Sequence, residues 1–291
     1  MKRTLFTLLI ALFVLSTTAQ TDEELEAMAN EVVYAKNTFY STRIVNSHSV
    51  DMVPKGVLEF RISHRFGELQ NGAYDLFGLD VATMRLGFDY GITDKLTLGI
   101  GRSTIEKTYD GFAKYEILKQ SSGGEKDVFV SLDFVTGMSV RTQDWQDARY
   151  DNYYTNRLSY FNQILVARQF SKKTSVQLMP TMVHRNLVDN LNESNDVYAL
   201  GAALHQQLLP ALVVNVEYFQ VFPNQIDDQY RNSLSVGFAF NTGWHSFSLH
   251  LSNSRSMYER GFITETSSRW DKSQIRIGFN ITREFHLVED W

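Results

Sequence analysis

The sequence predicts an all-β protein, a transmembrane antiparallel barrel of about twelve strands with a short helical or irregular lead-in. Three observations predict it. From residue 56 onward, segments of roughly ten residues carry an apolar residue at every second position, as strands with one face in lipid require. The connections between these segments alternate between short and long. An apparent export signal precedes them.

The first nineteen residues have the three parts of a secretory signal peptide. Lys2 and Arg3 form the positive start, residues 5–15 form an apolar run, and residues 16–19 form a small-residue cleavage region. We expect the mature chain to begin at Gln20. No later stretch approaches the roughly eighteen uncharged apolar residues of a membrane helix, so a helical membrane protein is not expected.

Residues 20–55 form the lead-in. Residues 22–36 have a helix-compatible composition with acidic residues at the start, where the helix dipole favours negative charge. Residues 37–55 show no clear period. Two placements stay open for this lead-in. It is either a periplasmic segment, which is the preferred interpretation, or a segment tucked into the barrel lumen.

The barrel is expected over residues 56–291. In its first strand Leu58, Phe60 and Ile62 share one face, and charged or small residues share the other. The strands near residues 83–91 and 96–101 repeat this pattern. Nine more strands are predicted near residues 112–119, 127–140, 157–170, 174–185, 197–207, 211–222, 233–241, 244–253 and 273–285. The facing of the strand at 157–170 is left unassigned because its apolar residues alternate poorly.

The connections predict the orientation of the barrel. Short turns are expected at residues 93–94, 120–126, 171–173, 208–210 and 242–243, and longer links at 67–80, 102–111, 141–156, 186–196, 223–232 and 254–272. Outer-membrane barrels have short periplasmic turns and long outer loops. We therefore expect an outer-membrane location with both termini in the periplasm.

Several function classes are disfavoured by composition. The chain has no cysteine, which excludes disulfides, thiolate metal sites and cysteine nucleophiles. Its net charge of −5 provides no basic stripe for nucleic acid. No cofactor motif, phosphate loop or metal-ligand spacing occurs in the sequence. The expected partners are outer-membrane lipids, the barrel-assembly machinery during insertion, and a small solute in the lumen.

Five blocks of sequence resemble a known family. They are RISHRFG at 61–67, LGFDYGITDKLTLGIGR at 86–102, EKTYDGF at 106–112, VHRNLV at 183–188 and GFITET at 261–266. These blocks are similar to a family of Bacteroidetes outer-membrane β-barrel proteins that is catalogued as a domain of unknown function. The resemblance spans residues 37–285. It implies a barrel in the outer membrane and supplies no catalytic residue.

One short motif suggests an enzyme. His250 and Ser252, with Glu265 thirteen residues further on, are similar to the His-x-Ser-Asn stretch of outer-membrane phospholipase A and lipid A deacylases. There the histidine acts as general base on the serine, and a third residue orients the imidazole. However, Leu249 and Leu251 form the apolar face, which turns His250 and Ser252 toward the lumen. Because those hydrolases need the pair to face lipid, a lumenal polar network is the preferred interpretation.

Alternation predicts which charged residues line the lumen. They are Glu59, Arg61, Arg65, Arg85, Asp89, Lys114, Glu116, Asp133, Arg185, Glu217 and Arg276. A mixture of both signs is compatible with a passage or pocket for small solutes and with charges paired inside a closed barrel. The leading hypothesis is a passive channel or solute-binding barrel. The alternatives are a lipid hydrolase and a closed structural or partner-docking barrel.

The longest predicted outer connection, residues 254–272, is too apolar for a freely solvated loop. Its apolar residues are Met257, Tyr258, Phe262 and Ile263. We expect this loop to fold back over or into the barrel mouth. There its charges are expected to meet Glu59, Arg61 and Arg276 on the closing strands.

Overall fold

The computed structural model describes residues 32–123, 127–144, 153–188, 190–241 and 245–288. The predicted signal peptide and residues 22–31 of the predicted helix lie outside these ranges. Within them, no helix is long and apolar enough to span a membrane.

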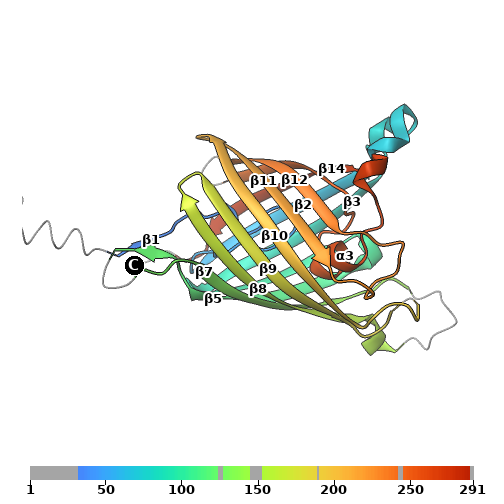
Figure 1. Ribbon diagram of the computed structural model, residues 1–291, viewed down its shortest axis with the longest axis horizontal. Helices are drawn as coiled ribbons and strands as arrows, with labels where there is room; N and C mark the ends of the chain where they lie inside the picture. The colour runs from blue at the N-terminus through green and yellow to red at the C-terminus, as the bar shows by residue number, and fades with distance from the viewer. Residues whose placement is uncertain (1–31, 124–126, 145–152, 189, 242–244, 289–291) are drawn as a thin grey trace, which may run out of the picture.

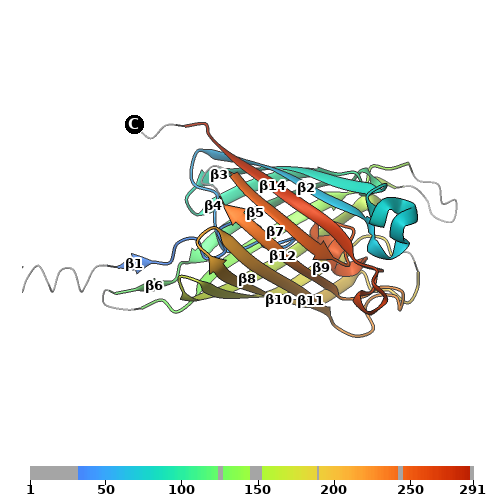
Figure 2. The same cartoon turned by 90° about the horizontal axis from the view of Figure 1, so that it is seen from above.

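Twelve antiparallel strands close into one barrel (Figures 1 and 2), which confirms the predicted fold class. The barrel strands are β2 Val57–Glu68, β3 Ala82–Thr93, β4 Leu96–Ser103, β5 Tyr109–Leu118, β7 Ser131–Val140, β8 Leu158–Ser171, β9 Thr174–Arg185, β10 Asp196–Leu209, β11 Leu212–Val221, β12 Ser233–Asn241, β13 His245–Ser252 and β14 Arg276–His286. Each strand pairs with its sequence neighbour, and β14 pairs with β2 to close the ring, with Ile281 opposite Ile62. Closure leaves no free edge.

The two ends of the barrel differ. At one end, which we call the short-turn end, brief turns join the strands, and β1 (Val33–Tyr34) pairs there with β6 (Ser121–Ser122). The other end, the long-loop end, carries α3 (Glu259–Thr264) and the 3₁₀ segments η1 Leu69–Gly78, η2 Ile105–Lys107, η3 Tyr154–Arg157 and η4 Trp270–Lys272 (Figure 1). The helix predicted over 22–36 is wrong for Val33–Tyr34, because strand β6 offers these β-favouring residues a pairing partner.

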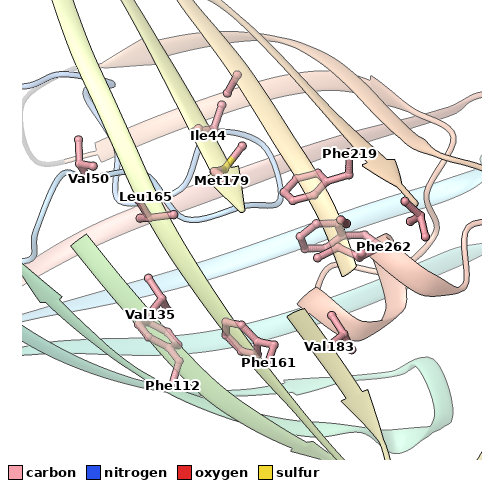
Figure 3. Packing of buried hydrophobic residues seen from close by; sticks show 14 of the residues in the cluster. Ile44, Val50, Phe112, Val135, Phe161, Leu165, Met179, Val183, Phe219 and Phe262 are labelled. Atoms are coloured by element: carbon pink, nitrogen blue, oxygen red, sulfur yellow. The ribbon is translucent and has the colours of Figure 1, made fainter. Parts of the chain in front are cut away.

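The inner face of the wall has two different halves. On β14, β2, β3, β4 and β5 most inward residues are polar, charged or glycine, whereas β8 to β11 carry a large apolar set that includes Leu165, Met179 and Phe219. Strand β8 is apolar on both faces, with Phe161 buried and Ile164 44% exposed, which explains why its facing was not predictable. The core therefore lies inside the barrel (Figure 3).

Candidate functional site

The lumen is filled by the chain's own residues 37–55, which we call the lumenal hairpin. Arg43 and His48 pair antiparallel, and the amide of Ile44 donates to the carbonyl of Ser47 at 2.9 Å, so the segment turns back on itself. Phe39, Ile44 and Val50 belong to the same buried cluster as the apolar half of the wall; Figure 3 shows Ile44 and Val50 among the wall residues. Of the two placements considered for these residues, the structure has the lumenal one.

Glu217 on β11 binds the tip of the hairpin. Its carboxylate accepts hydrogen bonds from the backbone amides of Val45, Asn46 and Ser47 at 3.0–3.2 Å. It also accepts from Asn46 Nδ2 at 2.7 Å and from Ser47 Oγ at 2.9 Å. Arg65 donates to Asn46 Oδ1 at 2.6 Å. These donors supply both carboxylate oxygens with hydrogen-bond partners, as a buried carboxylate requires.

Three further wall residues bind the hairpin. Asn280 Nδ2 donates to the carbonyl of Val45 at 2.9 Å. Gln177 donates to the carbonyl of His48 at 2.7 Å and accepts from the amide of Val50 at 3.0 Å. Lys114 Nζ donates to the carbonyls of Ser49 and Asp51 at 3.1 and 2.5 Å.

The base of the hairpin lies at the short-turn end. There Thr42 Oγ1 donates to Glu59 at 2.7 Å, and Arg61 contacts both groups. Two cavities of about 440 and 290 Å³ flank this base, and Asp51 lines both. The hairpin therefore leaves space around its base at this end.

The loop between β13 and β14 fills the opposite end, as the sequence predicted. All six residues of α3 are buried, and the Phe262 ring meets Phe219 edge-on at 5.2 Å between centroids. The predicted charge partners were wrong. Glu259 Oε1 accepts from Arg43 Nη1 of the hairpin at 2.6 Å, rather than meeting Arg61 or Arg276. The hairpin fills the centre of the lumen, so it reaches α3 before the closing strands do.

His48 lies beside the same ion pair. Its Nε2 is 3.3 Å from Glu259 Oε1, without a well-directed hydrogen bond. Burial lowers the pKa of His48 to about 3, and the charges of Arg43 and Lys114 act in the same direction. Burial alone raises the pKa of Glu259, but the charge of Arg43 holds it well below its usual range. The junction between hairpin and α3 thus favours a neutral imidazole and an ionised carboxylate.

The structure buries ten of the eleven predicted lumen-lining residues. These are Glu59, Arg61, Arg65, Arg85, Asp89, Lys114, Glu116, Asp133, Arg185 and Glu217. Arg276 is partly exposed at the long-loop end, where it donates to Glu68 at 2.7 Å. One pair joins two members of the set, Arg61 with Glu59 at 2.5 Å. Other members bind residues that the sequence analysis did not select, such as Asp110, Glu193 and the hairpin.

Sequence reasoning also missed Gln177 and Asn280, although both stand at inward positions and alternation could have identified them. The hairpin residues gave no such signal.

The three catalytic candidates do not form a hydrogen-bonded triad in the described part of the chain. Ser252 Oγ accepts from Ser235 Oγ at 2.9 Å. Both ring nitrogens of His250 are buried and lack hydrogen-bond partners there. Glu265 accepts from Arg260 at 2.5 Å instead. Since His250 and Ser252 are also buried away from lipid, the arrangement offers no general base acting on a serine.

Among the described residues, no group of three or more histidine, aspartate or glutamate side chains is arranged to hold a metal ion. The polar groups of the lumen are directed instead at the hairpin and the α3 loop.

Comparison with known proteins places the fold. No curated protein matches the chain. The solved NanC porin is 8% identical, with a TM-score of 0.50 over 78% of this chain and 98% of that one. The KdgM porin is 9% identical, with a TM-score of 0.48 over 79% and 99%. An outer membrane channel from Pseudomonas putida F1 is 15% identical, with a TM-score of 0.48 over 83% and 100%.

The likeness to the NanC porin shows the barrel fold alone. The family model described as "Membrane bound beta barrel domain (DUF5777)" matches residues 39–285 and so includes most of the lumenal hairpin. The chain belongs to this family of membrane-bound β-barrels, whose function is unknown.

Proposed function

We propose that this protein is an outer-membrane channel that its own lumenal hairpin, together with the α3 loop joined to it by the Arg43–Glu259 ion pair, holds closed, with the short-turn end in the periplasm. The observation that carries the proposal is the manner of closure. The hairpin enters and leaves the lumen by the same end, and residues 37–54 are not part of the twelve-strand ladder. Withdrawal therefore breaks side-chain contacts but no strand pair of the barrel.

The wall supports passage once the hairpin has left. The polar half, with residues such as Glu59, Arg61 and Asp89, is compatible with a water-filled lumen, as in porins. The family model matches from residue 39, before β2, so most of the hairpin lies within the family's domain. A closed structural barrel is the competing function, and bilayer recordings separate the two.

The conductance test uses Glu217→Leu, which removes the acceptor of five hydrogen bonds at the hairpin tip. We expect the wild-type protein to be nearly silent in planar bilayers and the variant to show discrete openings. Glu116→Leu is the matched control, because this buried wall acid pairs with Lys119 at 3.6 Å rather than with the hairpin. Retained heat-modifiable migration in gels verifies that each variant is folded.

A cross-link then ties the openings to the hairpin. Because the chain has no cysteine, a cysteine pair at Asn46 and Ser235, whose side chains lie 3.0 Å apart, can be joined cleanly by a short bifunctional thiol reagent. Cross-linking should abolish openings of the Glu217→Leu channel. A wild-type protein that conducts freely, or openings that persist after cross-linking, would overturn the proposal. Silence in every variant would also overturn the proposal, because release of the hairpin would then not open the lumen past the α3 loop.

The orientation has its own test. Tyr74 at the long-loop end is 94% exposed, and Asp94 lies exposed in a short turn. An impermeant thiol reagent on intact cells should label Tyr74→Cys and spare Asp94→Cys. The reverse pattern would place the short-turn end outside.

A further inference from the structure

The wall binds the hairpin mainly by its backbone. Four wall side chains, Glu217, Asn280, Gln177 and Lys114, contact eight main-chain groups between residues 45 and 51. These groups are the amides of Val45, Asn46, Ser47 and Val50 and the carbonyls of Val45, His48, Ser49 and Asp51. Main-chain groups are common to all peptides. This set of contacts is therefore largely independent of the hairpin's own sequence.

The hydrogen-bond acceptors of the wall face amides of the hairpin, and the donors of the wall face its carbonyls. Glu217 is an acceptor and faces three successive amides, whereas Lys114 and Asn280 Nδ2 are donors and face carbonyls. Gln177 contacts a carbonyl and an amide two residues apart, His48 and Val50, as a neighbouring β-strand does. A sugar presents hydroxyls that donate and accept at every position, so it does not need this separation.

The apolar half of the wall receives side chains. Phe39, Ile44 and Val50 pack into the cluster formed by residues such as Leu165 and Met179 (Figure 3). Polar side chains of the hairpin turn elsewhere, as the contacts of Thr42 and Asn46 show. An apolar face opposite a set of backbone-binding groups matches a chain that folds back in a turn and directs its apolar side chains to one side of the lumen.

We infer that the lumen is a binding site for peptides that fold back in a tight turn, and that the hairpin occupies it as an internal ligand. This inference rests on the proposed function, because a peptide in trans reaches the site only when the hairpin leaves. It assigns the cargo or effector of the channel to one class, peptide segments that fold back in a turn and carry apolar side chains at positions like those of Phe39, Ile44 and Val50. Its side-chain selectivity is concentrated at the positions of Thr42, Arg43 and Asn46, where the wall and α3 contact side chains.

The test uses the full chain with Arg43→Ala and Asn46→Ala, which loosen the hairpin and leave the wall intact. Three probes are added to the side of the short-turn end: a synthetic peptide of residues 38–52, a peptide with permuted polar residues that keeps the three apolar positions, and a linear oligosaccharide of similar length. Both peptides should block the current at concentrations within about tenfold of each other, since most contacts are with the backbone. The oligosaccharide should not block.

Matched wall variants locate the site. Gln177→Ala removes two backbone contacts and should raise the half-blocking peptide concentration roughly tenfold. Gln163→Ala is the control, because this equally buried glutamine donates to Thr181 of the wall, at 2.8 Å, and not to the hairpin. Equal effects of the two variants would overturn the inference. Block by the oligosaccharide would also overturn it, as would block by the peptide of residues 38–52 without block by the permuted peptide.

The failure of this inference is distinguishable from failure of the proposed function. Fluorescence polarisation of a labelled peptide with the loosened protein in detergent measures binding without any current. Peptide binding in a protein that never conducts would contradict the channel and keep the peptide site. Conductance without peptide binding or block would contradict the peptide site and keep the channel.

Discussion

The ion pair between Arg43 and Glu259 joins the hairpin to α3, the two elements that fill the lumen. Nη1 and Oε1 are 2.6 Å apart, and the side chains are 4% and 3% exposed. Removing one partner leaves the other charge buried and unpaired, which costs about 3–5 kcal/mol in proteins. If opening hydrates the orphaned group, Arg43→Met should shift the closed-to-open equilibrium toward opening by roughly a hundredfold to a few thousandfold.

Thiol labelling measures this shift even when the open state is rare. A cysteine at Val45, which is 4% exposed in the closed lumen, reacts with a water-soluble thiol reagent when the hairpin opens. With fast opening and closing, the labelling rate is proportional to the open fraction. Arg43→Met in this background should therefore accelerate labelling by the same factor, and Glu259→Gln should accelerate it as well.

The double variant Arg43→Met with Glu259→Leu distinguishes ion-pair loss from general damage. Replacing both charges by apolar groups of similar size removes the orphaned charge, and such replacements are often neutral or stabilising. Labelling in the double variant should return most of the way to the wild-type rate. Additive acceleration in the double variant, or single variants that label like wild type, would refute the reasoning about this junction.

Three further predictions concern the same closure. Because the closed state holds the pKa of His48 at about 3, below its ordinary value of 6.5, closure is fully stable above about pH 6.5 and weakens as the pH falls toward 3. Since only the thiolate reacts, the labelling rate is divided by that of a fully exposed cysteine at the same pH. This ratio should rise by up to tenfold per unit between pH 6 and 5, and with His48→Gln it should be nearly flat. Gly91→Ala places a Cβ 2.0 Å from the carbonyl oxygen of Pro54 and should destabilise the hairpin base by about 1–3 kcal/mol, which faster labelling would report. Gly111→Ala is the control, because the nearest atom to its added Cβ is 3.5 Å away, and it should leave the labelling rate unchanged. Phe262→Ala leaves a cavity against Phe219 and should lower the stability of the buried α3 by about 3–5 kcal/mol, seen as proteolysis of the loop at lower protease concentrations.

The strands were predictable because lipid imposes a strict rule on one face. Outward residues such as Ile62 and Phe88 must be apolar, so period two is visible wherever the inward face is polar. On β8 the inward Leu165 is as apolar as the outward Ile164, and the period disappears. The sequence therefore predicts the barrel well and its interior only where the interior is polar.

The filling of the lumen was not predictable in the same way. Residues 37–55 have no period because neither a helix nor a sheet determines their conformation. Their path is determined by Glu217, Gln177 and Lys114, which are far from the hairpin in sequence. A local pattern contains no information about such contacts. The catalytic motif failed for the opposite reason, since the local spacing of His250 and Ser252 suggested a chemistry that their burial does not support.

The surroundings of Lys114 bear on whether the hairpin can leave the lumen, as the proposed function requires. Lys114 Nζ donates to hairpin carbonyls, while both carboxylate oxygens of buried Asp133 have no hydrogen-bond partner among the described residues. The two residues are diagonal neighbours on adjacent strands, because Lys114 stands opposite Val135 and Glu116 stands opposite Asp133. When the hairpin leaves, Lys114 loses its hydrogen bonds to two carbonyls, and the Asp133 carboxylate lies within reach of its flexible side chain. The new pair offsets part of the lost binding, and entering water hydrates the rest of this region. Such an offset lowers the free energy of the empty lumen relative to the filled one, which favours a hairpin that can leave over one built permanently into the core.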